Sequence, residues 1–170
     1  MTQPKFTRQT LLDQLSQWEI ETSTIDHEAV FTVEQSQALH REIEGVHTKN
    51  LFLKDKKGAL FLVTADHETQ VDLKGLHPKL GAGRLSFGSA ERLMNHLGVT
   101  PGSVTAFALI NDGAGEVRFI LDKNLADAEI INCHPLENTA TTSIKRADLS
   151  KFVENTGHSV EVVDLEASAN

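Results

Sequence analysis

The chain has 170 residues, 39% of them hydrophobic and 24% charged, which is typical of one soluble globular domain. A formal net charge of −8 argues against a general nucleic-acid binder, and an aromatic content of 5% argues against an aromatic stacking platform for single strands. The single cysteine, Cys133, excludes an intramolecular disulfide and a multi-cysteine zinc site. We therefore predict a single domain over residues 1–170, with 165–170 as a flexible tail.

The distribution of charge and hydropathy sets further expectations. Residues 41–92 carry nine Lys/Arg and seven Asp/Glu, whereas the rest of the chain carries seven and 17. A local basic face is therefore compatible with the acidic total, although ordinary solvated lysines explain the pattern equally well. No apolar run approaches 18 residues, and the first ten residues lack the apolar core of a signal peptide. We expect a cytoplasmic protein without a membrane span.

Helix and strand signals alternate along the first half of the chain. Thr7 begins a predicted helix that runs to about Trp18, and Thr32 has the spacing of a capping box for a second helix. Pro78 is expected to stop a short helical turn that begins at Asp72. The remaining predictions are strands at 20–24, 48–54 and 59–64, the last two joined by a turn at 55–58.

The second half begins with a helix that is capped by Ser86 or Ser89 and ends at Gly98. The later predictions are strands at 104–110, 117–121, 129–133, 142–145 and 159–164, a turn at 111–113 and a helix at 147–156. Hairpins with peripheral helices indicate an α+β domain with a mixed, mostly antiparallel sheet.

Lys49 is the residue that most needs an explanation. If 48–54 is a strand, alternation places Lys49 on the same face as Leu51 and Leu53. A lysine on an apolar face has to extend its ammonium to water, find an ion-pair partner or meet a ligand. An edge-strand lysine with a buried stem and a plain ion pair with Asp66 or Asp72 are equally compatible with the sequence.

The usual catalytic and metal-binding patterns are missing. The eight histidines include no HxxxH or HExxH pair on a predicted helix, so we predict no metal site and no cofactor, although His47 and His134 could meet in space. Cys133 and His134 are adjacent on a strand and would point to opposite faces, which does not suit a thiolate beside its base. A serine nucleophile elbow is also absent.

Five segments together resemble the YbaK-like family of prolyl-tRNA editing proteins, and most closely its free-standing branch that hydrolyses alanine attached to proline tRNA. The segments are HTKNLFLKDKKG (47–58), LGAGRLSFGSAERLMNHLGVTPGSVTAF (80–107), LIND (109–112), NCHPLENTATTSI (132–144) and DLSKFVENTGH (148–158). The resemblance implies a compact, partly barrel-like mixed sheet surrounded by helices.

The resemblance also implies roles for individual residues. Lys49 matches the family's functional lysine and would position the substrate or stabilise charge, and the adjacent Asn50 would help to shape the site. His134 matches the histidine of the family's HPL loop and would line the pocket and orient the substrate. The family's G-x-x-x-P loop corresponds here to Gly102, Ser103, Val104, Thr105 and Ala106, with Ala106 in place of proline. This departure puts the shape of the amino-acid pocket in doubt more than the activity.

The function implied is trans-acting hydrolysis of mischarged Ala-tRNA(Pro). The alternatives are a deacylase for Cys or Ser on tRNA, and a non-catalytic module that binds tRNA or a synthetase. The expected partner is the acceptor end of proline tRNA, with prolyl-tRNA synthetase or an elongation factor as transient partners, and neither DNA nor a membrane is expected.

Overall fold

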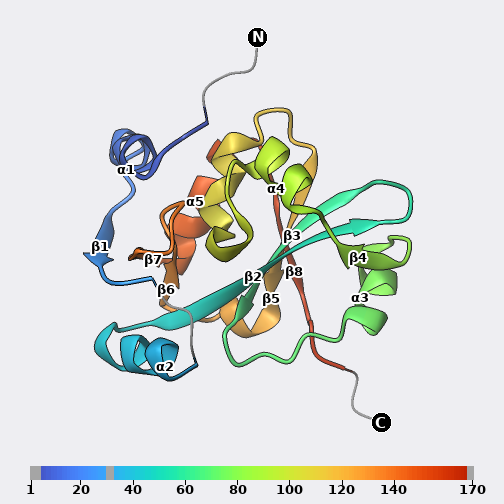
Figure 1. Cartoon of the computed structure of the whole chain (residues 1–170), viewed down its shortest axis with the longest axis horizontal. Helices are drawn as coiled ribbons and strands as arrows, with labels where there is room; N and C mark the ends of the chain where they lie inside the picture. The colour runs from blue at the N-terminus through green and yellow to red at the C-terminus, as the bar shows by residue number, and fades with distance from the viewer. Residues whose placement is uncertain (1–4, 30–32, 168–170) are drawn as a thin grey trace.

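A mixed sheet with helices around it organises residues 5–29 and 33–167, which the computed structural model describes (Figure 1). The α-helices are α1 (Arg8–Gln17), α2 (Val33–Glu42), α3 (Leu73–Leu80), α4 (Ala90–Leu97) and α5 (Arg146–Asn155). The 3₁₀ helices are η1 (Pro101–Ser103), η2 (Ala106–Asn111) and η3 (Lys123–Leu125). The strands are β1 (Thr22–Asp26), β2 (Val46–Asp55), β3 (Leu60–Asp66), β4 (Leu85–Phe87), β5 (Val117–Asp122), β6 (Ile130–Cys133), β7 (Ala140–Lys145) and β8 (Val160–Val163).

Strand β2 joins the two halves of the sheet, whose order is β1-β7-β6-β2-β3-β5-β8, with β4 also paired to β2. One edge of β2 pairs antiparallel with β3 over residues 48–54. The other edge pairs in parallel with β6 at Val46 and His47 and antiparallel with β4 at 53–55. Among the described residues, no strand pairs with that edge at 49–51, so β2 has an open stretch between β6 and β4.

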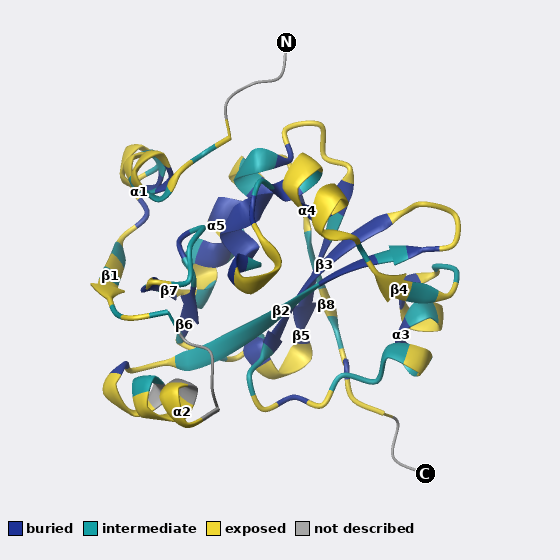
Figure 2. Cartoon of the chain, in the orientation of Figure 1, coloured by how far each residue is buried: buried dark blue, intermediate teal, exposed yellow. Residues whose placement is uncertain are grey.

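Two groups of buried side chains lie on opposite faces of β2 and β3. The larger group includes Phe52, Phe107 and Phe152, and it receives the buried leucines of α1, α4 and α5. The smaller group includes Leu53 and receives the buried leucines of α3. Figure 2 shows burial concentrated in β3, β5 and α5, whereas α2 is largely exposed. Alternation along β2 therefore assigns each residue of the strand to one of two environments.

The α+β class with a mixed sheet is confirmed, with four antiparallel and three parallel strand pairings. The predicted caps Thr7 and Ser89 accept hydrogen bonds from Thr10 N and Arg92 N, and Gly98 ends α4 in the left-handed conformation. The expected cap at Thr32 lies outside the described residues.

The predicted strand at 104–110 is wrong, because this segment forms the 3₁₀ helix η2. The Thr105 hydroxyl accepts a hydrogen bond from Phe107 N, and residues 106–109 are fully buried. An apolar run that is buried on all sides has no periodicity to distinguish strand from helix. The predicted hairpin turn at 111–113 is also wrong, because Asp112 instead accepts hydrogen bonds from Glu116 N and Val117 N.

The predicted stop at Pro78 is wrong as well. Helix α3 continues through Pro78 to Leu80 and ends at Gly81, which has φ of 63°. A proline this close to the end of a helix removes one backbone hydrogen bond. The burial of Leu76 and Leu80 stabilises the remaining turn.

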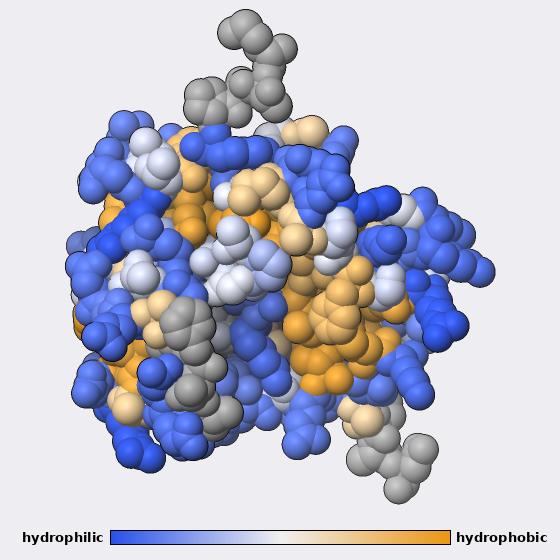
Figure 3. Space-filling view, viewed as in Figure 1, coloured by the Kyte–Doolittle hydropathy of each residue, from blue (hydrophilic) through white to orange (hydrophobic). Residues whose placement is uncertain are grey.

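Apolar side chains gather on the surface over β4 and α3 (Figure 3), and Phe87 of β4 is 61% exposed. Leu165, at the start of the expected flexible tail, is buried, and its carbonyl accepts a hydrogen bond from Asp72 N.

No helix among the described residues is long and apolar enough to cross a membrane.

Candidate functional site

A small, mostly polar cavity of about 120 Å³ lies at the amino-terminal end of β2. Its walls come from β2, β6, β7, η1, α2 and two loops, so it depends on contacts between distant parts of the chain. The lining residues are Leu39, His47, Thr48, His67, Gly102, Asn132, Cys133, His134, Asn138 and Thr141.

Asn132 is held in one orientation at the base of this cavity. Its side-chain Nδ2 donates to the carbonyl of Glu44 at 3.0 Å, and its Oδ1 accepts from the Ser143 hydroxyl. Its backbone carbonyl accepts from Thr48 Oγ1 at 2.8 Å. Gly45 permits this packing, because it has φ of 109° and an added Cβ would lie 2.9 Å from Asn132 Nδ2.

His134 presents a neutral imidazole to the cavity. Its Nδ1 lies 3.1 Å from the carbonyl oxygen of Ala140, which can only accept, so Nδ1 carries the hydrogen. Burial lowers the pKa of His134 below its usual value. At neutral pH the ring is therefore uncharged, and Nε2 is a hydrogen-bond acceptor that can orient a water or a substrate amine.

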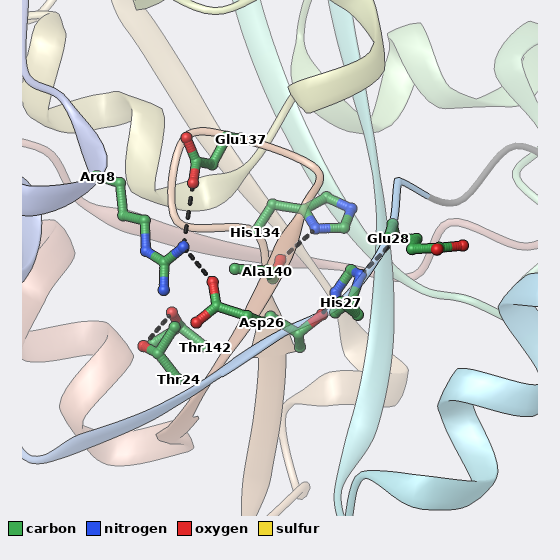
Figure 4. Close-up of polar contacts among 10 residues, drawn as sticks. Arg8, Thr24, Asp26, His27, Glu28, His134, Glu137, Ala140 and Thr142 are labelled. Carbon is green, nitrogen blue, oxygen red and sulfur yellow. Dashed lines mark hydrogen bonds and ion pairs between the residues drawn. The ribbon is translucent and has the colours of Figure 1, made fainter.

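The loop that carries His134 is fixed by contacts from the first helix. Leu136 has φ of 70°, an uncommon conformation for a branched residue. The next residue of the loop is Glu137, and Arg8 Nη1 of α1 lies 3.1 Å from Glu137 Oε1 and 2.5 Å from Asp26 Oδ1 (Figure 4). These ion pairs join α1, the end of β1 and the loop after β6.

Cys133 is unsuited to act as a nucleophile, although it lines the cavity. It is 2% exposed, and burial raises its thiol pKa to about 12. The thiolate, which is the nucleophilic form, is therefore scarce at neutral pH. This burial agrees with the sequence argument against a nucleophile pair of Cys133 and His134.

The structure brings Gly102 and His134 into the cavity lining, but not Lys49 or Asn50. Asn50 Oδ1 accepts from Thr64 Oγ1 at 2.5 Å, across β2 and β3. Of the rest of the 102–106 loop, Thr105 and Ala106 are fully buried, and Ala106 belongs to the larger core. Ser103 is buried and Val104 packs against that core, so only Gly102 of this loop reaches the cavity.

Lys49 directly follows two cavity residues, His47 and Thr48, and is half-buried. Its strand face is the one that carries Leu51 and Leu53, as the alternation predicted; Leu53 belongs to the smaller core and Leu51 packs against it. Within residues 5–29 and 33–167 its ammonium has no hydrogen bond or ion pair. Lys49 also begins the open stretch of β2, so no neighbouring strand confines its side chain on that edge.

Sequence reasoning missed most of the cavity wall. Thr48 and Asn132 stand inside the HTKN and NCHPL segments, so the motifs held a signal for them. Leu39, His67 and Thr141 carry no local signal, because their roles depend on how β2, β6 and α2 meet. His47 and His134 do line the same cavity, as their possible meeting in space suggested.

Three residues away from the cavity have the composition of a metal site. Among the described residues, His96, Asp112 and Glu116 form the one cluster whose ligand atoms all lie within 4.8 Å of one another. His96 Nδ1 already pairs with Glu116 Oε2 at 3.2 Å, and Asp112 Oδ2 pairs with buried His158 Nε2 at 2.8 Å. These contacts account for the cluster without a metal.

Comparison with known proteins identifies the family. The model of the aminoacyl-tRNA editing domain matches residues 27–152. The prolyl-tRNA editing protein ProX of Acetoanaerobium sticklandii is 36% identical over 93% of this chain and 97% of its own. The prolyl-tRNA synthetase associated domain-containing protein 1 of Danio rerio is 39% identical, over 94% of this chain and 88% of its own.

A solved structure supports the same fold. The crystal structure of a protein described as a candidate trans-editing enzyme for prolyl-tRNA synthetase aligns with a TM-score of 0.70 and 18% identity, over 94% of both chains. Together with the family match and the relatives, this likeness confirms the resemblance seen in the motifs: the chain belongs to the aminoacyl-tRNA editing domain family.

Proposed function

We propose that this protein removes alanine from mischarged Ala-tRNA(Pro) in trans. The general activity follows from the family: the protein is a trans-acting editing hydrolase that cleaves the aminoacyl ester of a tRNA. Alanine as the amino acid and proline tRNA as the carrier are our proposal. In it, the tRNA arrives after release from prolyl-tRNA synthetase or in exchange with an elongation factor.

The size of the cavity beside neutral His134 is the observation that carries the proposal. A volume of about 120 Å³ has room for a small amino acid. For scale, an apolar cavity of about 150 Å³ accommodates benzene. A synthetase site built for proline can reject the smaller alanine by only about 1–3 kcal/mol, the value of the apolar contact that alanine fails to make. A second site that admits alanine and excludes the proline ring by size supplies the missing selectivity.

The reaction needs no protein nucleophile, because the ester is already activated. The site has to hold the ester, position a water and stabilise the oxyanion that forms on the carbonyl oxygen. His134 Nε2 can accept a hydrogen bond from the water or from the substrate amine. Gly102, which has no side chain, lets the substrate approach the main chain closely.

We assign charge stabilisation to Lys49. The assignment is supported by the match to the family's lysine and by the position of Lys49, a half-buried residue whose ammonium lacks a described partner. Because β2 is open at 49–51, the four-carbon stem can carry the ammonium around that edge toward the mouth of the cavity. Asn50, fixed by Thr64, would maintain the shape of the strand beside it.

Serine is the second candidate substrate. The cavity wall includes the hydroxyls of Thr48 and Thr141, which donate their hydrogens to Asn132 O and His27 Nε2 and whose oxygens can still accept from a serine hydroxyl. Cysteine has a similar size, and selection between these residues depends on the polarity of the wall. A module that binds tRNA without catalysis is the remaining alternative.

The test is a panel of mischarged tRNAs under single-turnover conditions with enzyme in excess. We expect fast release of alanine from Ala-tRNA(Pro) and retention of proline on Pro-tRNA(Pro). Ser-tRNA and Cys-tRNA measure the competing specificities. Equal rates on alanyl and prolyl esters would contradict selection by size, and no hydrolysis of any ester would favour the non-catalytic module.

A further inference from the structure

A second hollow of about 280 Å³ adjoins the cavity, on the side of α2. Its walls include His27, Glu28, Ala29, Ala38, Leu39 and Glu42. We propose that this hollow binds the terminal nucleoside of the tRNA, an adenosine, while the smaller cavity holds the aminoacyl group. The proposal rests on the proposed function and adds the substrate's second binding site.

Two contacts show that the hollow and the cavity are neighbours. Leu39 lines both of them. His27, in the wall of the hollow, accepts a hydrogen bond at Nε2 from Thr141 Oγ1, 2.8 Å away, and Thr141 lines the cavity. The tautomer follows because His27 Nδ1 lies 2.7 Å from the carbonyl oxygen of Glu28, which can only accept. Figure 4 shows His27 and Glu28 beside His134.

The larger hollow and the smaller cavity match the relative sizes of the nucleoside and the aminoacyl group in the substrate. An aminoacyl ester is attached directly to the ribose of the last nucleoside, so its two binding sites have to adjoin. The hollow has more than twice the volume of the cavity, which corresponds to a nucleoside beside a small amino acid. In this proposal the ribose and the ester lie at the boundary between the two sites, beside Leu39 and the His27–Thr141 pair.

The lining chemistry fits a nucleoside and not a phosphate. Ala29, Ala38 and Leu39 offer apolar surface to the face of a base. The carboxylates of Glu28 and Glu42 can accept from the exocyclic amine of adenine. Among the described residues that line the hollow there is no Lys or Arg, so a phosphate would meet the negative charge of Glu28 and Glu42. The 5′-phosphate would therefore point outward, as it must when the rest of the tRNA follows.

The experiment uses a stable probe in which an amide replaces the ester, 3′-alanylamino-3′-deoxyadenosine. Ala38 is exposed, so Ala38→Phe fills the hollow without disturbing the core. Ala147→Phe, at an exposed position of α5, is the matched control. We expect at least tenfold weaker binding of the probe to Ala38→Phe by calorimetry, and unchanged binding to Ala147→Phe, with similar melting temperatures.

The inosine form of the probe, which lacks the exocyclic amine, should also bind more weakly to the wild-type protein. Equal affinity of Ala38→Phe and wild type for the adenosine probe would overturn the proposal. Deacylation of Ala-tRNA(Pro) by the same Ala38→Phe protein at the wild-type KM would also overturn it, while leaving the proposed function intact. If the probe binds at the hollow but no tRNA ester is hydrolysed, the proposed function fails and the nucleoside site stands.

Discussion

Replacement of Lys49 by alanine tests the catalytic assignment most directly. An ammonium about 4 Å from a developing oxyanion contributes about 4 kcal/mol at an effective dielectric constant of about 20. Loss of one such stabilising group lowers kcat by roughly 10²–10³ in other enzymes. We expect Lys49→Ala to slow single-turnover deacylation of Ala-tRNA(Pro) by that factor. Lys49→Arg should restore only part of the rate, because a planar guanidinium replaces a compact ammonium poorly.

The folded state should tolerate this change. Lys49 has no described ion pair to lose. Truncation of its half-buried stem lowers the free energy of unfolding by less than roughly 0.8 kcal/mol for each methylene removed, the value for a fully buried one. Thermal melting of each variant therefore accompanies the kinetics. Lys54→Ala is the matched control, because Lys54 is another half-buried lysine of β2, at its far end beside β4. A well-folded Lys49→Ala protein with a near-normal rate would refute the reasoning and make Lys49 structural.

Four further predictions concern the cavity and its support. Cys133→Ala should retain most activity, since its thiol pKa is about 12, and a loss of two orders of magnitude in a folded variant would restore the thiol mechanism. Because the pKa of His134 is lowered, kcat/KM should stay level from pH 8 to about 6.5 and decline only at lower pH. The unfolded chain takes up this proton first, so the free energy of unfolding should fall below about pH 6.5, and less so in His134→Asn. Arg8→Ala should lower kcat several-fold with little change in KM, and the loss should vanish in a His134→Asn background if Arg8 acts through that loop.

Local signals made much of the fold predictable. The caps Thr7, Ser89 and Gly98 act within one helical turn, and the alternation around Lys49 depends only on neighbours in the strand. The prediction of a strand at 104–110 was wrong because an apolar run gives the same pattern in a buried strand and a buried helix. At Pro78, the packing of leucines on both sides outweighed a single lost hydrogen bond.

The site was predictable only where its residues share a motif. His134 and Gly102 were found from the family pattern, and both line the cavity. The rest of the wall depends on the parallel pairing of β2 with β6, which joins His47 to Asn132 across 85 residues. No pattern in the sequence links Arg8 to Glu137 either, since 129 residues separate them.

The anchorage of the His134 loop on Arg8 has a consequence for how this domain can be transplanted. The family pattern begins at residue 27, yet α1 contributes buried Leu11 and Leu15 to the larger core, and Arg8 holds Glu137. A fusion protein that received only residues 27–152, which the family model matches, would carry the cavity but lose the helix whose Arg8 contacts the His134 loop. A working graft should therefore begin no later than Thr7, the residue that caps this helix.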